Sequence, residues 1–167
     1  LFRSAGPVVG IAQAAMHAAS MIATGFTIIS TLPRSMPVQY ALARKYGFER
    51  HLKKVRAAGV PVLELEDPHS GAADKVKAEV EKAIAEDGAE AILLGCAGMV
   101  DLARRLTDET GVPVLDGVTA AVKMVEALVG LGLKTSKACA YDYPRAKPYS
   151  GEFTAAAPGP RPAKAAE

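Results

Sequence analysis

The sequence predicts an α/β fold: a parallel four-stranded sheet with helices on both faces. Three observations predict it, namely four short aliphatic runs, amphipathic helical patterns around them, and runs that are apolar almost throughout. Strands that alternate with helices pair in parallel through right-handed crossovers. Nearly continuous apolar character is expected of strands covered by helices on both faces. The predicted strands are FTIIST at 26–31, VPVLELE at 60–66, EAILLG at 90–95 and VPVLDG at 112–117.

Helical patterns fill the intervening sequence. The clearest is 72–88, because Val76, Val80, Ala83 and Ile84 fall on one face at helical spacing. A second helix is predicted over 35–47, with Ser35 as its N-cap, Pro37 in its first turn and Gly47 at its C-terminal stop. The other predicted helices are 10–23 with Ile11, Ala15, Ala18 and Ile22 on one face, 49–59, a polar helix that begins near Gly98, and 116–132 with Val118, Val122, Val125 and Val129 on one face.

Composition and charge exclude several classes of function. The 167 residues carry 20 Lys+Arg and 18 Asp+Glu, interleaved, for a net charge of +2, which argues against a nucleic-acid partner. No uninterrupted apolar tract reaches the roughly 18 residues of a membrane span, and no signal peptide is visible. The histidines, His17, His51 and His69, are scattered, so no metal site is predicted, and His17 is expected to be a packed side chain.

The cysteines predict a reducing compartment. Cys96 and Cys139 show no CxxC spacing and no disulfide framework, which favours free thiols in the cytoplasm. Cys139 lies in the irregular stretch SKACAYDYP and has no supporting pattern. A thiol redox protein is disfavoured because no resolving cysteine lies near Cys96. A small phosphotyrosine phosphatase is excluded because its phosphate-binding Arg would fall at Leu102.

The chemistry is predicted at the carboxyl ends of the strands, where open α/β sheets bind ligands. Of the stretches that follow the strands, only GCAGM at 95–99 offers a strong nucleophile or base, Cys96. Gly95 and Gly98 are expected to let the backbone turn tightly and approach a ligand. The unpaired N–H groups of a helix that starts near Gly98 would favour a thiolate and hold an oxyanion. The alternative, a small buried apolar cysteine, has equal weight on these residues alone.

Weaker candidates follow two other strands. Ser30 and Thr31 end the first strand and are expected either to bond a polar ligand or to serve ordinary turn chemistry. Asp116 follows VPVL and is expected either to orient a ligand or, the favoured alternative, to cap the next helix.

Several segments together resemble one enzyme family. GPVVGIAQAAMHAAS, TLPRSMP, AEAILLGCAGM, GVPVLDGVTAAVKMVEALVGLGLKTSK and KPYSG are similar, in order, to the hydantoin racemase branch of the aspartate/glutamate racemase superfamily. The likeness runs from Gly6 to Gly151, and GCAGM followed by VPVLDGV at this distance is its most specific part.

The resemblance implies a cofactor-independent racemase that acts on a small molecule, with two cysteines on opposite faces of the substrate. One thiolate removes the proton at C5 of a 5-monosubstituted hydantoin, and the other thiol returns one from the far side. Cys96 matches the family's second catalytic cysteine. The resemblance also implies substrate-binding roles for Ser30, Thr31, Gly95, Ala97, Gly98, Asp116, Gly117 and Val118.

The sequence also departs from the family. Such racemases have two α/β lobes, and their first cysteine lies in a Cys-Phe-x-Asp-Pro-Gly-like segment that has no counterpart here. We therefore expect a chain truncated at its N-terminus, inactive alone, whose full-length form is a homo-oligomer. The expected organisation is a helical remnant of the first lobe at 1–24, the second lobe at 25–115, a helix returning to the first lobe at 116–134, and an irregular, disordered tail at 135–167.

This organisation predicts how the isolated chain behaves. The apolar faces of 7–23 and 117–132 would have no sheet to cover, so the isolated chain is expected to be marginally stable or to associate through them.

An allantoin racemase or an amino-acid racemase is the nearest alternative in function. An α/β lobe that binds a small molecule or a partner without turnover is a different class of alternative.

Overall fold

The computed structural model describes residues 5–159, which fall into two compact units. Residues 9–124 form the larger unit, which contains the whole sheet. Residues 5–8 and 125–159 are the described part of the other.

The larger unit is built on a four-stranded parallel sheet in the order β2-β1-β3-β4. Ile28 in the central strand pairs with Val55 on one side and Leu93 on the other. The predicted fold class is therefore confirmed. The strands are β1 (Phe26–Ser30), β2 (Leu52–Ala57), β3 (Ala91–Leu94) and β4 (Val114–Asp116).

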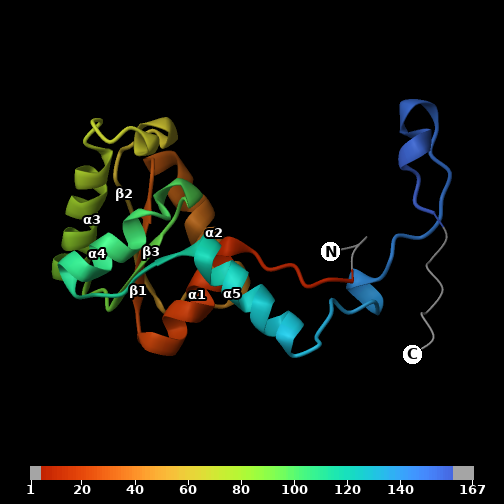
Figure 1. The fold of residues 1–167 in the computed structure, drawn as a ribbon, viewed down its shortest axis with the longest axis horizontal. Helices are drawn as coiled ribbons and strands as arrows, with labels where there is room; N and C mark the ends of the chain where they lie inside the picture. The colour runs from red at the N-terminus through yellow and green to blue at the C-terminus, as the bar shows by residue number, and fades with distance from the viewer. Residues whose placement is uncertain (1–4, 160–167) are drawn as a thin grey trace. The chain divides into compact units, whose positions relative to one another are not determined.

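Helices cover both faces of this sheet, α1 and α2 on one face and α3 and α4 on the other (Figure 1). Successive strand residues point to opposite faces. Ile28 and Leu93 accordingly pack in the cluster with α1 and α2, whereas Ile29 and Leu94 pack with α3 and α4. The helices are α1 (Ile11–Ile22), α2 (Met36–Tyr46), α3 (Ala72–Asp87) and α4 (Leu102–Thr110).

Two neighbouring predictions were wrong, because the predicted helix is a strand and the predicted strand is a helix. The predicted helix 49–59 is the edge strand β2, and the predicted strand 60–66 is a 3-10 helix, η2 (Val62–Glu66). In β2, Lys53 and Lys54 are exposed while Val55 is buried, and charged side chains of this kind are common on edge strands. The second segment has no place in the sheet, because β1 already pairs with β2 and β3, and Pro61 has no N–H to offer.

The face predicted for the first helix was wrong in part, since Ala15 is buried but both isoleucines are exposed. Ala15 and Ala19 are buried in the cluster with β1 and β3, but Ile11 is 46% exposed and Ile22 is 58% exposed. The expectation that 7–23 has no sheet to cover is therefore corrected, since α1 packs on β3 and β4. The small alanine side chains allow this close approach, and they carry little hydrophobic signal in the sequence.

The ends of α2 were predicted in part. Gly47 ends the helix with a φ of +82°, the left-handed conformation that glycine adopts at little cost. Ser35 does occupy the N-cap position, but its hydroxyl donates to the Leu32 carbonyl at 2.6 Å and does not cap the helix.

Helix α5 (Gly117–Gly130) follows β4, with Ala121 buried and Val122 50% exposed. Beyond it, residues 135–159 contain only the 3-10 turns η4 (Cys139–Tyr141) and η5 (Gly151–Ala156). Thr135 donates its N–H to the Ala5 carbonyl and its hydroxyl to the Gly6 carbonyl.

Residues 1–4 of the predicted remnant and 160–167 of the predicted tail lie outside the described residues. Among residues 5–159, no helix combines the length and apolar character needed to cross a membrane.

Candidate functional site

Cys96 lies at the carboxyl edge of the sheet, two residues after β3 ends at Leu94. Its backbone is extended, and it precedes a 3-10 turn, η3 (Ala97–Met99). The thiol is half-buried and free, and packs beside the core shared by α3 and α4. The helix predicted to start near Gly98 is thus only a single turn, and α4 begins later, at Leu102.

Three consecutive backbone N–H groups beside the thiol have no acceptor within residues 5–159. They belong to Cys96, Ala97 and Gly98, whereas the next two N–H groups are used, from Met99 to the Cys96 carbonyl at 3.1 Å and from Val100 to the Ala97 carbonyl at 3.3 Å. Such donors can hold a carbonyl oxygen on which negative charge develops. These three N–H groups are hydrogen-bond donors of the kind that the sequence analysis expected at the start of a longer helix.

Close packing, and not a tight turn, explains why position 95 is a glycine. Neither Gly95 nor Gly98 has a positive φ. A Cβ at Gly95 would lie 3.1 Å from both the Ile29 carbonyl oxygen and Gln39 Nε2. Gly95 donates its N–H to Ile29 at 2.8 Å, and its carbonyl accepts from Gln39 at 3.2 Å. The sequence analysis missed Gln39, because nothing in the pattern of α2 predicts which of its side chains reaches another element.

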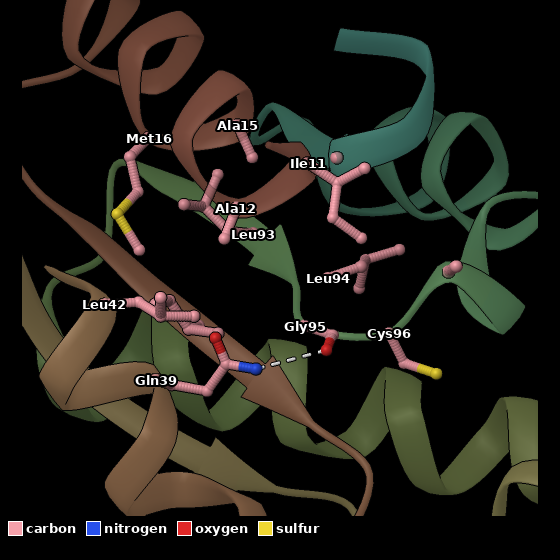
Figure 2. A pocket seen from close by; sticks show the side chains of 13 residues that line it. Ile11, Ala12, Ala15, Met16, Gln39, Leu42, Leu93, Leu94, Gly95 and Cys96 are labelled. Carbon is pink, nitrogen blue, oxygen red and sulfur yellow. Dashed lines mark hydrogen bonds between the residues drawn. The ribbon is translucent and has the colours of Figure 1, made fainter. Parts of the chain in front are cut away.

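A pocket with an empty volume of about 560 Å³, partly open to solvent, borders the same loop. Its walls include Ala12 and Met16 of α1 and Leu42 of α2, so it is mainly apolar. In Figure 2 the Cys96 sulfur points away from Gln39, Leu42 and Met16. The pocket therefore touches the loop that carries the cysteine, while the thiol itself faces the other way.

The two hydroxyl candidates lie at the same edge of the sheet but are buried. Ser30 is 1% exposed, and its hydroxyl lies 2.6 Å from that of Ser35. Thr31 is 7% exposed, and its carbonyl accepts the Val60 N–H at 3.0 Å. Ser30 thus serves the turn chemistry predicted as its alternative role.

Asp116 is an N-cap, the favoured of its two predicted roles. Its Oδ1 accepts the N–H of Thr119, in the first turn of α5, at 2.7 Å. Only 8% of Asp116 is exposed, so its carboxylate is committed to the start of this helix.

Gly117 and Val118, also predicted at the site, form the start of α5. Gly117 is buried and lines the pocket, and Val118 is half-buried. A Cβ on Gly117 would lie 2.7 Å from the Ile11 carbonyl oxygen and 2.9 Å from its carbon. The backbone of α1 therefore approaches so closely that only glycine fits.

Replacing Gly117 with alanine should lower the free energy of unfolding by about 1–3 kcal/mol, since the obstacle is backbone that must shift. Urea unfolding measures this change. The control is Gly130→Ala, because Gly130 ends the same helix and has nothing within 4 Å of its Cβ position. Equal free energies of unfolding for the two variants would contradict the close approach of α1.

Comparison with known proteins agrees with this arrangement. The sequence profile of the Asp/Glu/Hydantoin racemase family matches residues 3–125. The chain belongs to this family. The hydantoin racemase of Rhizobium meliloti is 56% identical over 146 residues, which are 87% of this chain and 61% of that protein. The hydantoin racemase of a Pseudomonas species is 45% identical, over 87% of this chain and 58% of that protein.

Solved structures of the family have the same fold. The allantoin racemase of Klebsiella pneumoniae superposes with a TM-score of 0.86 at 51% identity, over 90% of this chain and 62% of that one. The allantoin racemase of Pseudomonas fluorescens gives a TM-score of 0.83 at 42% identity, over 88% of this chain and 63% of that one. The chain thus spans about three fifths of the length of its relatives. The predicted family is confirmed.

Proposed function

We propose that this chain carries one of the two acid–base thiols of a cofactor-independent racemase for 5-monosubstituted hydantoins. The observation that carries the proposal is Cys96 at the carboxyl edge of the sheet, beside three unused N–H groups, in a member of this family. Neither a metal ion nor an organic cofactor has a role in this chemistry.

The proton at C5 is acidic because the carbanion beside a carbonyl spreads onto the oxygen as an enolate. In the proposed reaction, the Cys96 thiolate takes this proton and becomes a thiol, while the N–H groups of Cys96, Ala97 and Gly98 bind the enolate oxygen. A second thiol then gives a proton to the opposite face of C5 and becomes a thiolate. The family's segment for that second thiol has no counterpart in these 167 residues.

The remaining predicted roles are part of the proposal. Ser30, Thr31, Gly95, Asp116, Gly117 and Val118 lie at the carboxyl edge of the sheet and would shape the substrate site, Ser30 and Asp116 by fixing the turn and the helix start behind it and not by touching the substrate. Residues 25–115 would be the second lobe, 116–134 would return to the first lobe, and full-length protein would be a cytoplasmic homo-oligomer.

Allantoin is the second candidate substrate, because the structural neighbours are named as allantoin racemases. Allantoin is itself a hydantoin ring with a ureido group at C5, so the same proton transfer applies. A racemase for free amino acids, and a lobe that binds a small molecule without turnover, are the other candidates.

With the 167-residue chain alone, the optical rotation of a pure 5-benzylhydantoin enantiomer should decay no faster than it does in buffer. The reason is that inversion needs proton return on the opposite face, and the family's segment for the second thiol has no counterpart in these 167 residues. Polarimetry of the purified chain tests this expectation. Inversion that exceeds the buffer rate and disappears in Cys96→Ser would contradict the two-thiol proposal.

A further inference from the structure

Gln39 of α2 lines the pocket and binds the loop that carries Cys96 (Figure 2). Its Nε2 donates to the Gly95 carbonyl at 3.2 Å, although the two residues lie 56 positions apart in the sequence. Gln39 is half-buried and shares the sheet-facing side of the helix with Met36 and Ala43, which belong to the core cluster there. A polar side chain on such a face needs a hydrogen-bond partner, and the Gly95 carbonyl is that partner.

The absence of a side chain at Gly95 allows this amide to approach. A Cβ at Gly95 would lie only 3.1 Å from Gln39 Nε2. The preceding peptide unit, between Leu94 and Gly95, is fixed by the sheet, because the Gly95 N–H donates to the Ile29 carbonyl at 2.8 Å. The Gln39 amide holds the next unit along the chain, between Gly95 and Cys96.

Holding this unit by its carbonyl also sets the direction of its N–H. The Gly95 carbonyl and the Cys96 N–H belong to one planar, trans peptide unit, so they point in opposite directions. The Cys96 N–H is the first of the three unused donors beside the thiol, and no acceptor within the described residues holds it from its own side. A hydrogen bond to the carbonyl also polarises the unit, and it does so more strongly where the surroundings are apolar.

We propose that Gln39 is a positioning residue, which holds the peptide unit between Gly95 and Cys96 so that its N–H points at the enolate oxygen of the substrate. The inference rests on the proposed function, because it requires that oxygen to bind beside Cys96. The Cys96 sulfur points away from Gln39 (Figure 2). Gln39 therefore acts on the binding of the oxygen and not on the reactivity of the thiol.

Gln39→Met removes the donor and tests the proposal. All variants are made in the Cys139→Ser chain, which lacks the other, exposed thiol. Methionine has a similar length, favours a helix and suits the apolar pocket. We expect the exchange of the C5 proton of 5-benzylhydantoin for deuterium to slow about tenfold, less than the loss of about 10²–10³-fold that follows removal of an oxyanion donor itself. Gln39→Glu should slow exchange at least as much at neutral pH, since an ionised carboxylate accepts but does not donate.

The matched control is Tyr40→Phe, at the next position of the same helix. The Tyr40 hydroxyl accepts the N–H of Val55 in β2 at 3.1 Å, so this variant also loses one hydrogen bond between α2 and the sheet. Because β2 is separated from β3 by β1, this bond is remote from Cys96. We expect Tyr40→Phe to exchange the C5 proton as fast as the parent chain, and urea unfolding verifies that both variants are folded. Equal slowing in Gln39→Met and Tyr40→Phe would reduce Gln39 to a packing role and overturn the inference.

Two further readouts follow the peptide unit and the thiol separately. In NMR spectra, Gln39→Met should shift the signals of the Gly95 carbonyl carbon and the Cys96 amide nitrogen, whereas Tyr40→Phe should leave both in place. The rate at which N-methylmaleimide alkylates Cys96 should be unchanged in Gln39→Met. Alkylation that slows as much as exchange does would contradict the inference, because Gln39 would then act on the thiol.

The outcomes separate this inference from the proposed function. Slower exchange in Gln39→Met, with unchanged alkylation and an unaffected Tyr40→Phe chain, supports the positioning role. Exchange that is slowed by Cys96→Ser but not by Gln39→Met would overturn the positioning role and leave Cys96 as the base. Exchange in the parent chain that is no faster than in buffer would overturn the proposed function and this inference together.

Discussion

Replacing Arg56 with methionine should lower the free energy of unfolding by about 3–5 kcal/mol, because it leaves a buried carboxylate without its main partner. The Arg56 side chain is 8% exposed and that of Asp87 is 6% exposed. Arg56 donates to Asp87 through Nε at 2.7 Å and through a terminal nitrogen at 2.6 Å, and it also bonds Glu86 at 2.6 Å. Without Arg56, Asp87 keeps only the Thr27 hydroxyl at 3.1 Å and Lys54 at 3.7 Å.

The same pair predicts how stability depends on pH. Hydrogen bonding to the Arg56 guanidinium holds the pKa of Asp87 below its usual value. A carboxyl whose pKa is lowered by folding stabilises the native state above its unfolded pKa of about 3.9, and the stabilisation is lost as the pH falls through the lower folded value. The chain with Arg56 should therefore lose more stability on acidification than the Arg56→Met chain.

Urea unfolding at neutral and at acid pH measures both effects. The control is Arg44→Met, whose ion pair with Glu49 has side chains 73% and 61% exposed, so its loss should lower the free energy of unfolding far less than the loss of Arg56. A double variant, Arg56→Met with Asp87→Leu, should be more stable than Arg56→Met alone, since no buried charge is left unpaired. Equal costs for Arg44→Met and Arg56→Met would contradict the importance of burial for this ion pair.

Replacing Cys96 with serine should slow the exchange of the C5 proton of 5-benzylhydantoin for deuterium, relative to the unmodified chain, by about 10²-fold or more. One base suffices for exchange on one face, so we expect the 167-residue chain to catalyse this exchange without inversion. Serine preserves the size of the side chain but is far less acidic than a thiol. Proton NMR in deuterated water follows the C5 signal directly.

The matched control for this experiment is Cys139→Ser. Cys139 is exposed and begins the 3-10 turn η4, within residues 135–159, which have no α-helix or strand. Its replacement should leave the exchange rate unchanged. An equal loss of exchange in the two serine variants would argue for a general thiol effect and against a site at Cys96.

The sequence predicted those features that depend on local periodicity. The helical spacing of Val76, Val80 and Ala83 identified α3, and all three side chains are buried. The apolar run that ends at Leu94 identified β3 and placed Cys96 at a strand end, where ligands bind. The capping role of Asp116 is likewise local, since its partner Thr119 is three residues away.

The errors concern features that only tertiary contacts decide. The segment 49–59 contains Leu52 and Val55 at a spacing that suits a helix, but an ion pair with Asp87 lets Arg56 be buried in an edge strand. The approach of α1 to Gly117, the hydrogen bond from Gln39 to Gly95 and the approach of Leu65 to Gly98 each join segments far apart in sequence. A single sequence carries no periodic signal for such contacts.

The central claim is that the Cys96 thiolate removes the C5 proton, and comparing two pH profiles of one chain tests it most directly. In the Cys139→Ser chain, the rate of C5 exchange and the rate of Cys96 alkylation are measured from acid to alkaline pH. Our account predicts that both rates rise over the same pH interval, because each requires the same thiolate. An exchange rate that rises over a different interval, or that persists after Cys96 has been alkylated, would contradict it.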